Sequence, residues 1–114
     1  MLKKTLRLTT PQFNSTIEKG KFARSPLFSV RYTSSEADTR ISAAVPIKEA
    51  KKAVERNRIR RRVYEAIATL AAKISPGTHA VVFCRQKVLE SDFKSMRDEL
   101  EMVFVKAGLL KVRT

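Results

Sequence analysis

The distribution of apolar residues along this chain of 114 residues predicts an α+β fold, a two-layer sandwich of helices on a mixed sheet. Three observations support this class. Two segments alternate between apolar and polar residues as half-buried strands do, one short segment is continuously apolar, and three segments repeat apolar residues at helical spacing. Because the chain is 43% apolar and long enough to bury one core, we expect residues 1–114 to form a single domain.

The first part of the chain is expected to form a helix followed by strands. The helix should begin at Thr10 as its N-cap, with proline in the first turn, and end at Gly20. Residues 27–33 and 40–45 alternate as strands, and the polar residues 34–39 between them predict a hairpin loop. The faces expected to be apolar carry Phe28, Val30 and Tyr32 in one strand and Ile41, Ala43 and Val45 in the other.

A long amphipathic helix is predicted over residues 51–74, because apolar residues recur there at a period near 3.6. The apolar stripe consists of Ile59, Val63, Ala66, Ile67, Leu70 and Ile74. Arg58, Arg62 and Glu65 should project from the opposite side, while Tyr64 lies on a flank. The helix should therefore present its arginines to solvent and its stripe to the core.

The last part of the chain predicts a buried strand and a closing helix. Residues 80–84 are continuously apolar, which is typical of a strand in the middle of a sheet. Ser91 is the expected N-cap of the final helix, and Gly108 its end. The stripe of that helix consists of Phe93, Met96, Leu100, Val103, Phe104 and Ala107.

Side chains suited to catalysis or metal binding are sparse. Cys84 lies in an apolar run, and His79 would point to the other face of the same strand, so we expect both to be structural. The acidic residues of the last helix are expected to form a solvated face, with magnesium binding as the alternative; they are Asp92, Asp98, Glu99 and Glu101. Without an apolar run of membrane-spanning length or a secretory signal, we expect a cytoplasmic protein.

Positive charge is the most informative property of the sequence. The formal net charge is +13, and residues 48–62 hold eight basic residues against two acidic ones. Five of the seven residues in 56–62 are arginines, which repel one another on a helix unless a polyanion neutralises them. Guanidinium groups bind phosphate bidentately and stack on exposed bases. The charge therefore indicates a nucleic-acid partner, although charge alone does not separate RNA from DNA.

The sequence KAVERNRIRR at residues 52–61 resembles the signature of the bacterial ribonuclease P protein subunit. The context agrees over nearly the whole chain, from the basic N-terminus to the apolar strand ending at Arg85. The resemblance implies the order αβββαβα with a left-handed βαβ crossover. It also implies a role in removing 5′ leaders from precursor tRNA, together with a catalytic RNA that holds the active site and most of the Mg²⁺. Neither a membrane nor an obligatory protein partner is expected.

The resemblance assigns two sets of binding residues and no catalytic or metal-binding residue. The catalytic RNA would contact the arginine helix through Lys52, Arg56, Asn57, Arg58, Arg60 and Arg61. The leader would lie in a groove between the first helix and the sheet, contacted by Phe13, Ile17 and Arg31. Ile17 and Arg31 stand where the family frequently has aromatic residues, Tyr64 where it is usually basic, and Lys51 where glycine is frequent.

Two other functions fit the charge of the chain. One is a ribosomal or other structural RNA-binding protein without a catalytic partner, and the other is a DNA-binding module. The Arg-Asn-Arg signature favours the ribonuclease P assignment over the first. The lack of a helix-turn-helix or zinc-finger pattern disfavours the second.

Overall fold

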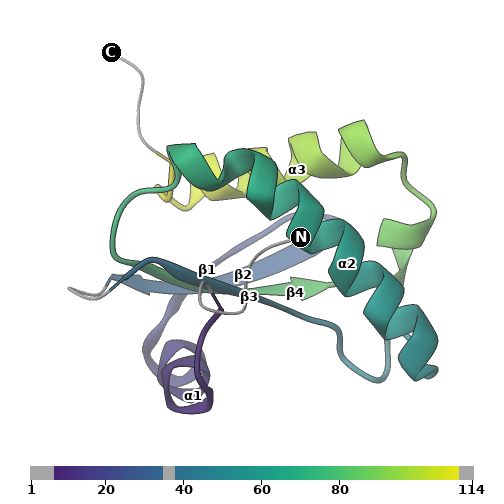
Figure 1. Ribbon diagram of the computed structural model, residues 1–114, viewed down its shortest axis with the longest axis horizontal. Coiled ribbons are helices and arrows are strands. Elements are labelled where there is room, and N and C mark those ends of the chain that lie inside the picture. Colours follow the sequence, from purple (N-terminus) through teal and green to yellow (C-terminus); the bar gives the residue numbers. More distant parts are fainter. Residues whose placement is uncertain (1–6, 35–37, 111–114) are drawn as a thin grey trace.

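The computed structural model describes residues 7–34 and 38–110, which form a four-stranded mixed sheet with helices on both faces (Figure 1). The order αβββαβα and the α+β class are confirmed. The elements are α1 (Thr10–Lys19), β1 (Lys21–Arg24), β2 (Phe28–Ser34), β3 (Arg40–Ala44), α2 (Ala53–Leu70), η2 (Ala71–Lys73), β4 (Thr78–Cys84), η3 (Gln86–Leu89) and α3 (Phe93–Lys106).

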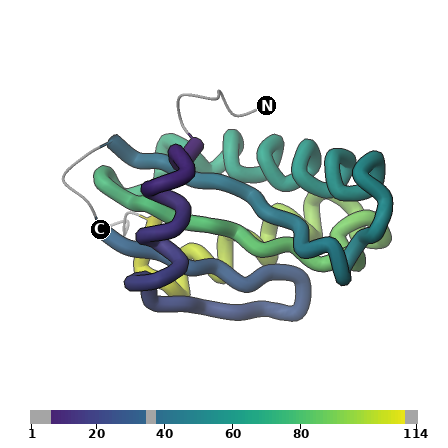
Figure 2. Tube along the Cα trace, turned by 90° about the horizontal axis from the view of Figure 1, so that it is seen from below, coloured from purple at the N-terminus to yellow at the C-terminus, as the bar shows by residue number. Residues whose placement is uncertain are grey.

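The strands lie in the order β1-β2-β4-β3. Neighbouring strands are antiparallel except for β3 and β4, which run parallel. The two parallel strands are joined through α2, and the two views together show that this crossover is left-handed (Figures 1 and 2). β4 is central and buried on both faces, as its continuous apolar sequence predicts.

The predicted hairpin between residues 27–33 and 40–45 is wrong, because β4 lies between β2 and β3. Alternation identifies a strand and its buried face but not its neighbour. The central position of β4 requires a partner on each side, and β2 and β3 are those partners. Residues 35–37 of the proposed loop lie outside the described part of the chain. The prediction also failed to locate β1, a short strand in which only Ala23 is buried.

The main core lies between the sheet and the pair of helices α2 and α3 (Figure 1). The predicted stripe of α2 is buried throughout, although the α-helix ends at Leu70 and a 3-10 turn, η2, precedes Ile74. In α3 the buried residues are Met96, Leu100, Val103 and Phe104. Burial of these apolar surfaces is the main stabilising contribution that the fold offers.

Two side chains of α2 do not lie where helical periodicity placed them. Arg62 was expected on the solvent side, but it is half-buried and donates a hydrogen bond from Nη2 to the Ser91 carbonyl oxygen at 2.7 Å. Tyr64 was expected on a flank, but it is 5% exposed and its hydroxyl accepts a hydrogen bond from the Ala43 amide at 3.0 Å. Both differences arise because α2 has neighbours on two sides, with α3 on one and the edge strand β3 on the other.

Both predicted N-caps are displaced by one residue. Thr9, rather than Thr10, caps α1 and forms a capping box with Gln12. Asp92, rather than Ser91, caps α3 by accepting a hydrogen bond from the Ser95 amide. A cap side chain must reach the amide three residues ahead, and this spacing selects Thr9 and Asp92. Gly20 and Gly108 end their helices as expected.

Helix α1 lies on the other face of the sheet and crosses the strands near one end (Figure 2). It packs on β2 and β4 and leaves the rest of that face uncovered by helices. A Cβ atom at Gly20 would lie 2.3 Å from the Thr16 carbonyl oxygen and 3.1 Å from the backbone of Tyr32. Glycine therefore allows the end of α1 to approach β2 closely. Among the described residues, no helix is long and apolar enough to cross a membrane.

Candidate nucleic-acid interface

The first half of α2 carries an exposed array of cationic and polar side chains. Arg58, Arg61 and Asn57 are exposed, as is Lys52 at the N-cap. Within the described part of the chain, no side chain caps the first amides of this helix. Unpaired amides and the helix dipole add positive potential at the end where the arginines begin.

The remaining two predicted RNA-contact residues, Arg56 and Arg60, are half-buried and held in place by hydrogen bonds. Arg56 donates from Nη1 to the carbonyl oxygens of Ala50 at 2.9 Å and Lys51 at 2.8 Å. Arg60 donates from Nη2 to the side-chain oxygen of Asn57. These contacts hold the Arg56 guanidinium group against the segment before α2 and that of Arg60 against Asn57, and they limit the rotamer entropy that each would lose on binding an anion.

A surface hollow of about 340 Å³ lies beside this array, lined by Arg7, Asn57, Arg60, Arg61 and Tyr64. The guanidinium carbon of Arg7 lies 4.3 Å from the centroid of the Tyr64 ring. Three guanidinium groups, one from the segment before α1 and two from α2, therefore line one concave site, which suits phosphate oxygens. Sequence reasoning missed Arg7. The basic character of the N-terminal segment was visible, but its position against α2 was not.

A short segment before α1 links this hollow to the opposite face of the sheet. The Arg7 carbonyl oxygen accepts a hydrogen bond from Arg40 Nη1 at 3.1 Å, and the Leu8 amide donates to Ser42 Oγ at 2.9 Å. Arg40 and Ser42 both belong to β3. The chain thus passes over the β3 edge, with the Arg7 side chain on the α2 side and helix α1 on the other.

The second predicted surface lies along α1. Phe13 and Ile17 are half-buried and share the helix face that contains the buried Thr16. Arg31 of β2 donates from Nη1 to the Ile17 carbonyl oxygen at 3.3 Å, which places its guanidinium group at the end of α1. The structure therefore brings Arg31 to Ile17, with Phe13 one helical turn further along the same face.

Two shallow hollows follow the line where α1 meets the sheet. One is lined by Pro11, Gln12, Ser15, Thr16, Thr33, Ser34 and His79. The other is lined by Lys19, Lys21, Tyr32, Thr33 and Ser34. Both hollows lie on the flank of α1 that carries Gln12, Ser15 and Lys19, and neither is lined by Phe13, Ile17 or Arg31.

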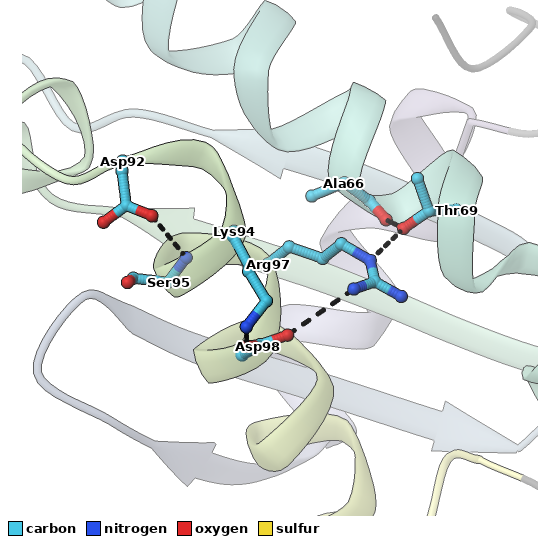
Figure 3. Close-up of polar contacts among 7 residues, drawn as sticks. All are labelled: Ala66, Thr69, Asp92, Lys94, Ser95, Arg97 and Asp98. Atoms are coloured by element: carbon cyan, nitrogen blue, oxygen red, sulfur yellow. Dashed lines mark hydrogen bonds and ion pairs between the residues drawn. The ribbon is translucent and has the colours of Figure 1, made fainter.

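The acidic residues at the start of α3 are engaged with neighbouring groups (Figure 3). Hydrogen bonds from Ser95 lower the pKa of the exposed Asp92 carboxyl, which caps the helix. Asp98 pairs with Lys94 at 3.8 Å and with Arg97 at 3.5 Å. These carboxylates serve as a cap and as surface ion pairs, in agreement with the expected solvated face.

Glu99 differs from the other acids because it links α3 to the turn between β1 and β2. Its Oε2 accepts hydrogen bonds from Ser25 Oγ at 2.6 Å and from the Leu27 amide at 2.7 Å. The part of the chain that the structure describes contains no group of three or more His, Cys, Asp or Glu residues that could hold a metal ion. The structure therefore offers no support for the magnesium alternative at the acids of α3.

Cys84 and His79 occupy structural positions on opposite faces of β4, as expected. Cys84 is 1% exposed in the main core, and burial raises the pKa of its thiol from 9.0 to about 12. His79 is buried, and its Nε2 lies 3.0 Å from the Asp38 carbonyl oxygen. Because a carbonyl oxygen only accepts, Nε2 carries the proton in this contact. The thiol is protonated and inaccessible, which excludes it as a nucleophile in the folded state.

Comparisons with known proteins identify relatives over nearly the whole chain. The family model described as Ribonuclease P matches residues 2–108. The ribonuclease P protein component of Rippkaea orientalis is 32% identical, covering 96% of this chain and 91% of the relative. That of Symbiobacterium thermophilum is 34% identical, covering 96% and 97%.

Solved structures show the same fold. The RNase P protein of Staphylococcus aureus superposes with a TM-score of 0.80 at 24% identity, covering 95% of this chain and all of that one. The RNase P protein of Thermotoga maritima superposes with a TM-score of 0.74 at 26% identity, covering 85% and 94%.

Proposed function

The chain belongs to the bacterial ribonuclease P protein component family, and from this premise we propose how it works within a ribonucleoprotein that matures the 5′ ends of tRNA. The first half of α2 binds the catalytic RNA of that particle. The groove beside α1 binds the single-stranded 5′ leader of precursor tRNA. The protein positions both RNAs, and the catalytic RNA supplies the reacting groups.

The observation that carries the catalytic-RNA assignment is the hollow formed by Arg7, Asn57, Arg60, Arg61 and Tyr64. Its guanidinium groups converge on one concave site, next to the exposed Arg58 and Lys52 at the uncapped start of α2. A-form RNA is bound largely through its phosphates and shape, because its major groove is deep and narrow. A convex helix with a cationic hollow at its side fits such a backbone.

The leader assignment is supported by the form of the second surface. Phe13 and Ile17 lie on the flank of α1 away from the two hollows, where Arg31 reaches the Ile17 carbonyl oxygen. Beyond α1, that face of the sheet is not covered by a helix (Figure 2). A single strand of RNA presents unstacked bases and a flexible backbone, which can follow an open sheet face beside a helix.

Three further assignments complete the proposal. Mg²⁺ is held mainly by the catalytic RNA, an assignment that rests on membership of the ribonuclease P protein family. The particle works in the cytoplasm, where bacterial precursor tRNA is processed. Residues 1–114 act as one RNA-binding domain, a proposal supported by the continuous hydrophobic core.

Replacing Phe13 with alanine tests the leader assignment. Stacking of a base on an aromatic ring is worth ~1–3 kcal/mol, so binding of precursor tRNA to the reconstituted particle should weaken by roughly 5- to 100-fold. Mature tRNA, which has no leader, should bind as before. Phe93→Ala is the matched control, because Phe93 is a partly exposed phenylalanine of α3, on the other side of the sheet.

Equal weakening of precursor and mature tRNA by Phe13→Ala would contradict the leader assignment and indicate that Phe13 only packs α1 against the sheet. Melting temperatures of all variants separate loss of binding from loss of folding. In the same assay Cys84→Ala and His79→Ala should keep cleavage within a few-fold of the parent. A loss of several orders of magnitude in either folded variant would indicate a catalytic group in the protein.

A further inference from the structure

One aromatic side chain on the open face of the sheet has no role in the core. Phe22 of the edge strand β1 is 53% exposed. Its neighbour Ala23 is buried in the core on the α3 side of the sheet, so Phe22 points to the opposite face, on which α1 lies. Single exposed apolar residues are common on proteins, so exposure alone does not establish a site. The groups around the ring are what distinguish it.

Two guanidinium groups lie over the Phe22 ring. The guanidinium carbon of Arg24 is 4.8 Å from the ring centroid, and that of Arg31 is 5.4 Å away. Arg31 is the cross-strand partner of Phe22 in β2, and its hydrogen bond to the Ile17 carbonyl oxygen limits its movement. The ring and both cations therefore form one preorganised cluster at the end of α1, where α1 leaves the sheet face open.

We propose that Phe22, Arg24 and Arg31 form a binding site for one unpaired nucleotide of the RNA strand in the α1 groove. This inference rests on the proposed leader-binding function. The base stacks against the ring or an adjoining guanidinium plane, and the arginines contact the flanking phosphates. Ile17 has no flat face to offer, so Phe22 supplies the stacking surface at this point of the groove.

The chemistry of the cluster selects its occupant. A paired base hides both of its faces in the helical stack, so only an unpaired base can extend a stack with Phe22. Arg24, Arg31 and the exposed Lys21 give this end of the sheet a positive charge and favour an anionic chain. A single aromatic ring contacts the flat face of a base and not the hydrogen-bonding groups on its edge, so the site should accept any of the four bases.

The test combines protein variants with leaders that lack one base. Phe22→Leu keeps an apolar side chain but removes the ring, Phe22→Tyr keeps the ring, and Phe93→Leu is the matched control on α3. Binding to the reconstituted particle is measured with uncleavable precursor tRNA, with mature tRNA, and with a series of leaders carrying one abasic nucleotide each. Melting temperatures confirm that every variant is folded.

We expect Phe22→Leu to weaken precursor binding by roughly 5- to 100-fold and to leave mature tRNA unaffected, whereas Phe22→Tyr and Phe93→Leu bind like the parent. In the parent, one abasic position should reproduce the loss. That abasic position should cost Phe22→Leu nothing further, because the two changes remove the same interaction.

Two results would overturn the inference, and they are distinguishable. If the parent prefers precursor over mature tRNA and Phe22→Leu retains this preference in full, the nucleotide site is wrong while the leader function stands. If adding the parent protein to the catalytic RNA creates no preference for precursor tRNA, the leader function itself is wrong, and the nucleotide site falls with it.

Discussion

Removal of two exposed arginines from α2 gives the most direct test of the catalytic-RNA interface. Arg58 and Arg61 are both exposed, and removing them leaves the core and the Arg56 and Arg60 hydrogen bonds in place. We therefore expect Arg58→Ala/Arg61→Ala to fold normally and to bind the catalytic RNA more weakly, with a lower dependence on salt.

The size of the effect follows from counterion release. Each phosphate contact contributes roughly 0.7–0.9 to the slope of log affinity against log salt, so two lost contacts lower that slope by at most about 1.4–1.8. Between 50 and 200 mM salt the parent should consequently lose at most about 7- to 12-fold more affinity than the variant. Filter binding or fluorescence anisotropy with the catalytic RNA over this range measures both slopes.

The control must remove the same charge from another part of the molecule. Lys73 follows α2 at its far end, and Lys106 lies in the last turn of α3. Lys73→Ala/Lys106→Ala therefore lowers the net charge by the same two units, at positions outside the first half of α2. An equal change of slope in both pairs would show that net charge alone is responsible. An unchanged slope in Arg58→Ala/Arg61→Ala would refute phosphate contact by these arginines.

Three further outcomes concern stability and reactivity. Leu70→Ala should lower the free energy of unfolding by about 2–5 kcal/mol. Arg62→Ala should lower it by only about 1 kcal/mol, because the variant loses one charged hydrogen bond but also loses a buried Nε that has no partner among the described residues. Urea titration compares the two variants. Tyr64→Phe should cost about 1–3 kcal/mol by leaving the Ala43 amide unpaired, and a neutral result would mean that water replaces the hydroxyl. The Cys84 thiol should react with iodoacetamide only after unfolding, and rapid labelling of the folded protein at pH 8 would contradict its burial. Burial raises the pKa of this thiol to about 12 in the folded state, so the thiol ionises more readily in the unfolded chain. The parent should therefore lose stability relative to Cys84→Ala as the pH rises from 9 towards 12.

The elements that the sequence predicts well are those whose burial can be recognised within a short stretch of sequence. The stripe of α2 faces the core, and every residue assigned to it is buried. The continuous apolar run of β4 identifies a central strand, because both faces of such a strand must be covered. In both cases the spacing of apolar residues follows directly from which faces are buried.

The predictions that failed depend on contacts between distant segments. Arg62 and Tyr64 have polar atoms that meet backbone groups of Ser91 and Ala43, and no periodicity within α2 contains that information. The pairing of β2 with β4 instead of β3 is likewise a property of the whole sheet. At the candidate site, the arginines of α2 were visible as a charge run. Arg7 and Phe22 became recognisable only when the fold placed them beside the guanidinium groups of distant residues.

The hydrogen bond from the Ala43 amide to Tyr64 also determines how the sheet meets other chains. Edge strands expose amides and carbonyls that can pair with a strand of another molecule, which is a common route to aggregation. On β3, the Tyr64 hydroxyl occupies one such amide and residues 7–8 run across the strand. On β1, the edge is only four residues long and carries the exposed charges of Lys21 and Arg24. Both edges of the sheet thus discourage strand addition. Copies of the protein that are brought close together on RNA therefore do not pair through their sheet edges.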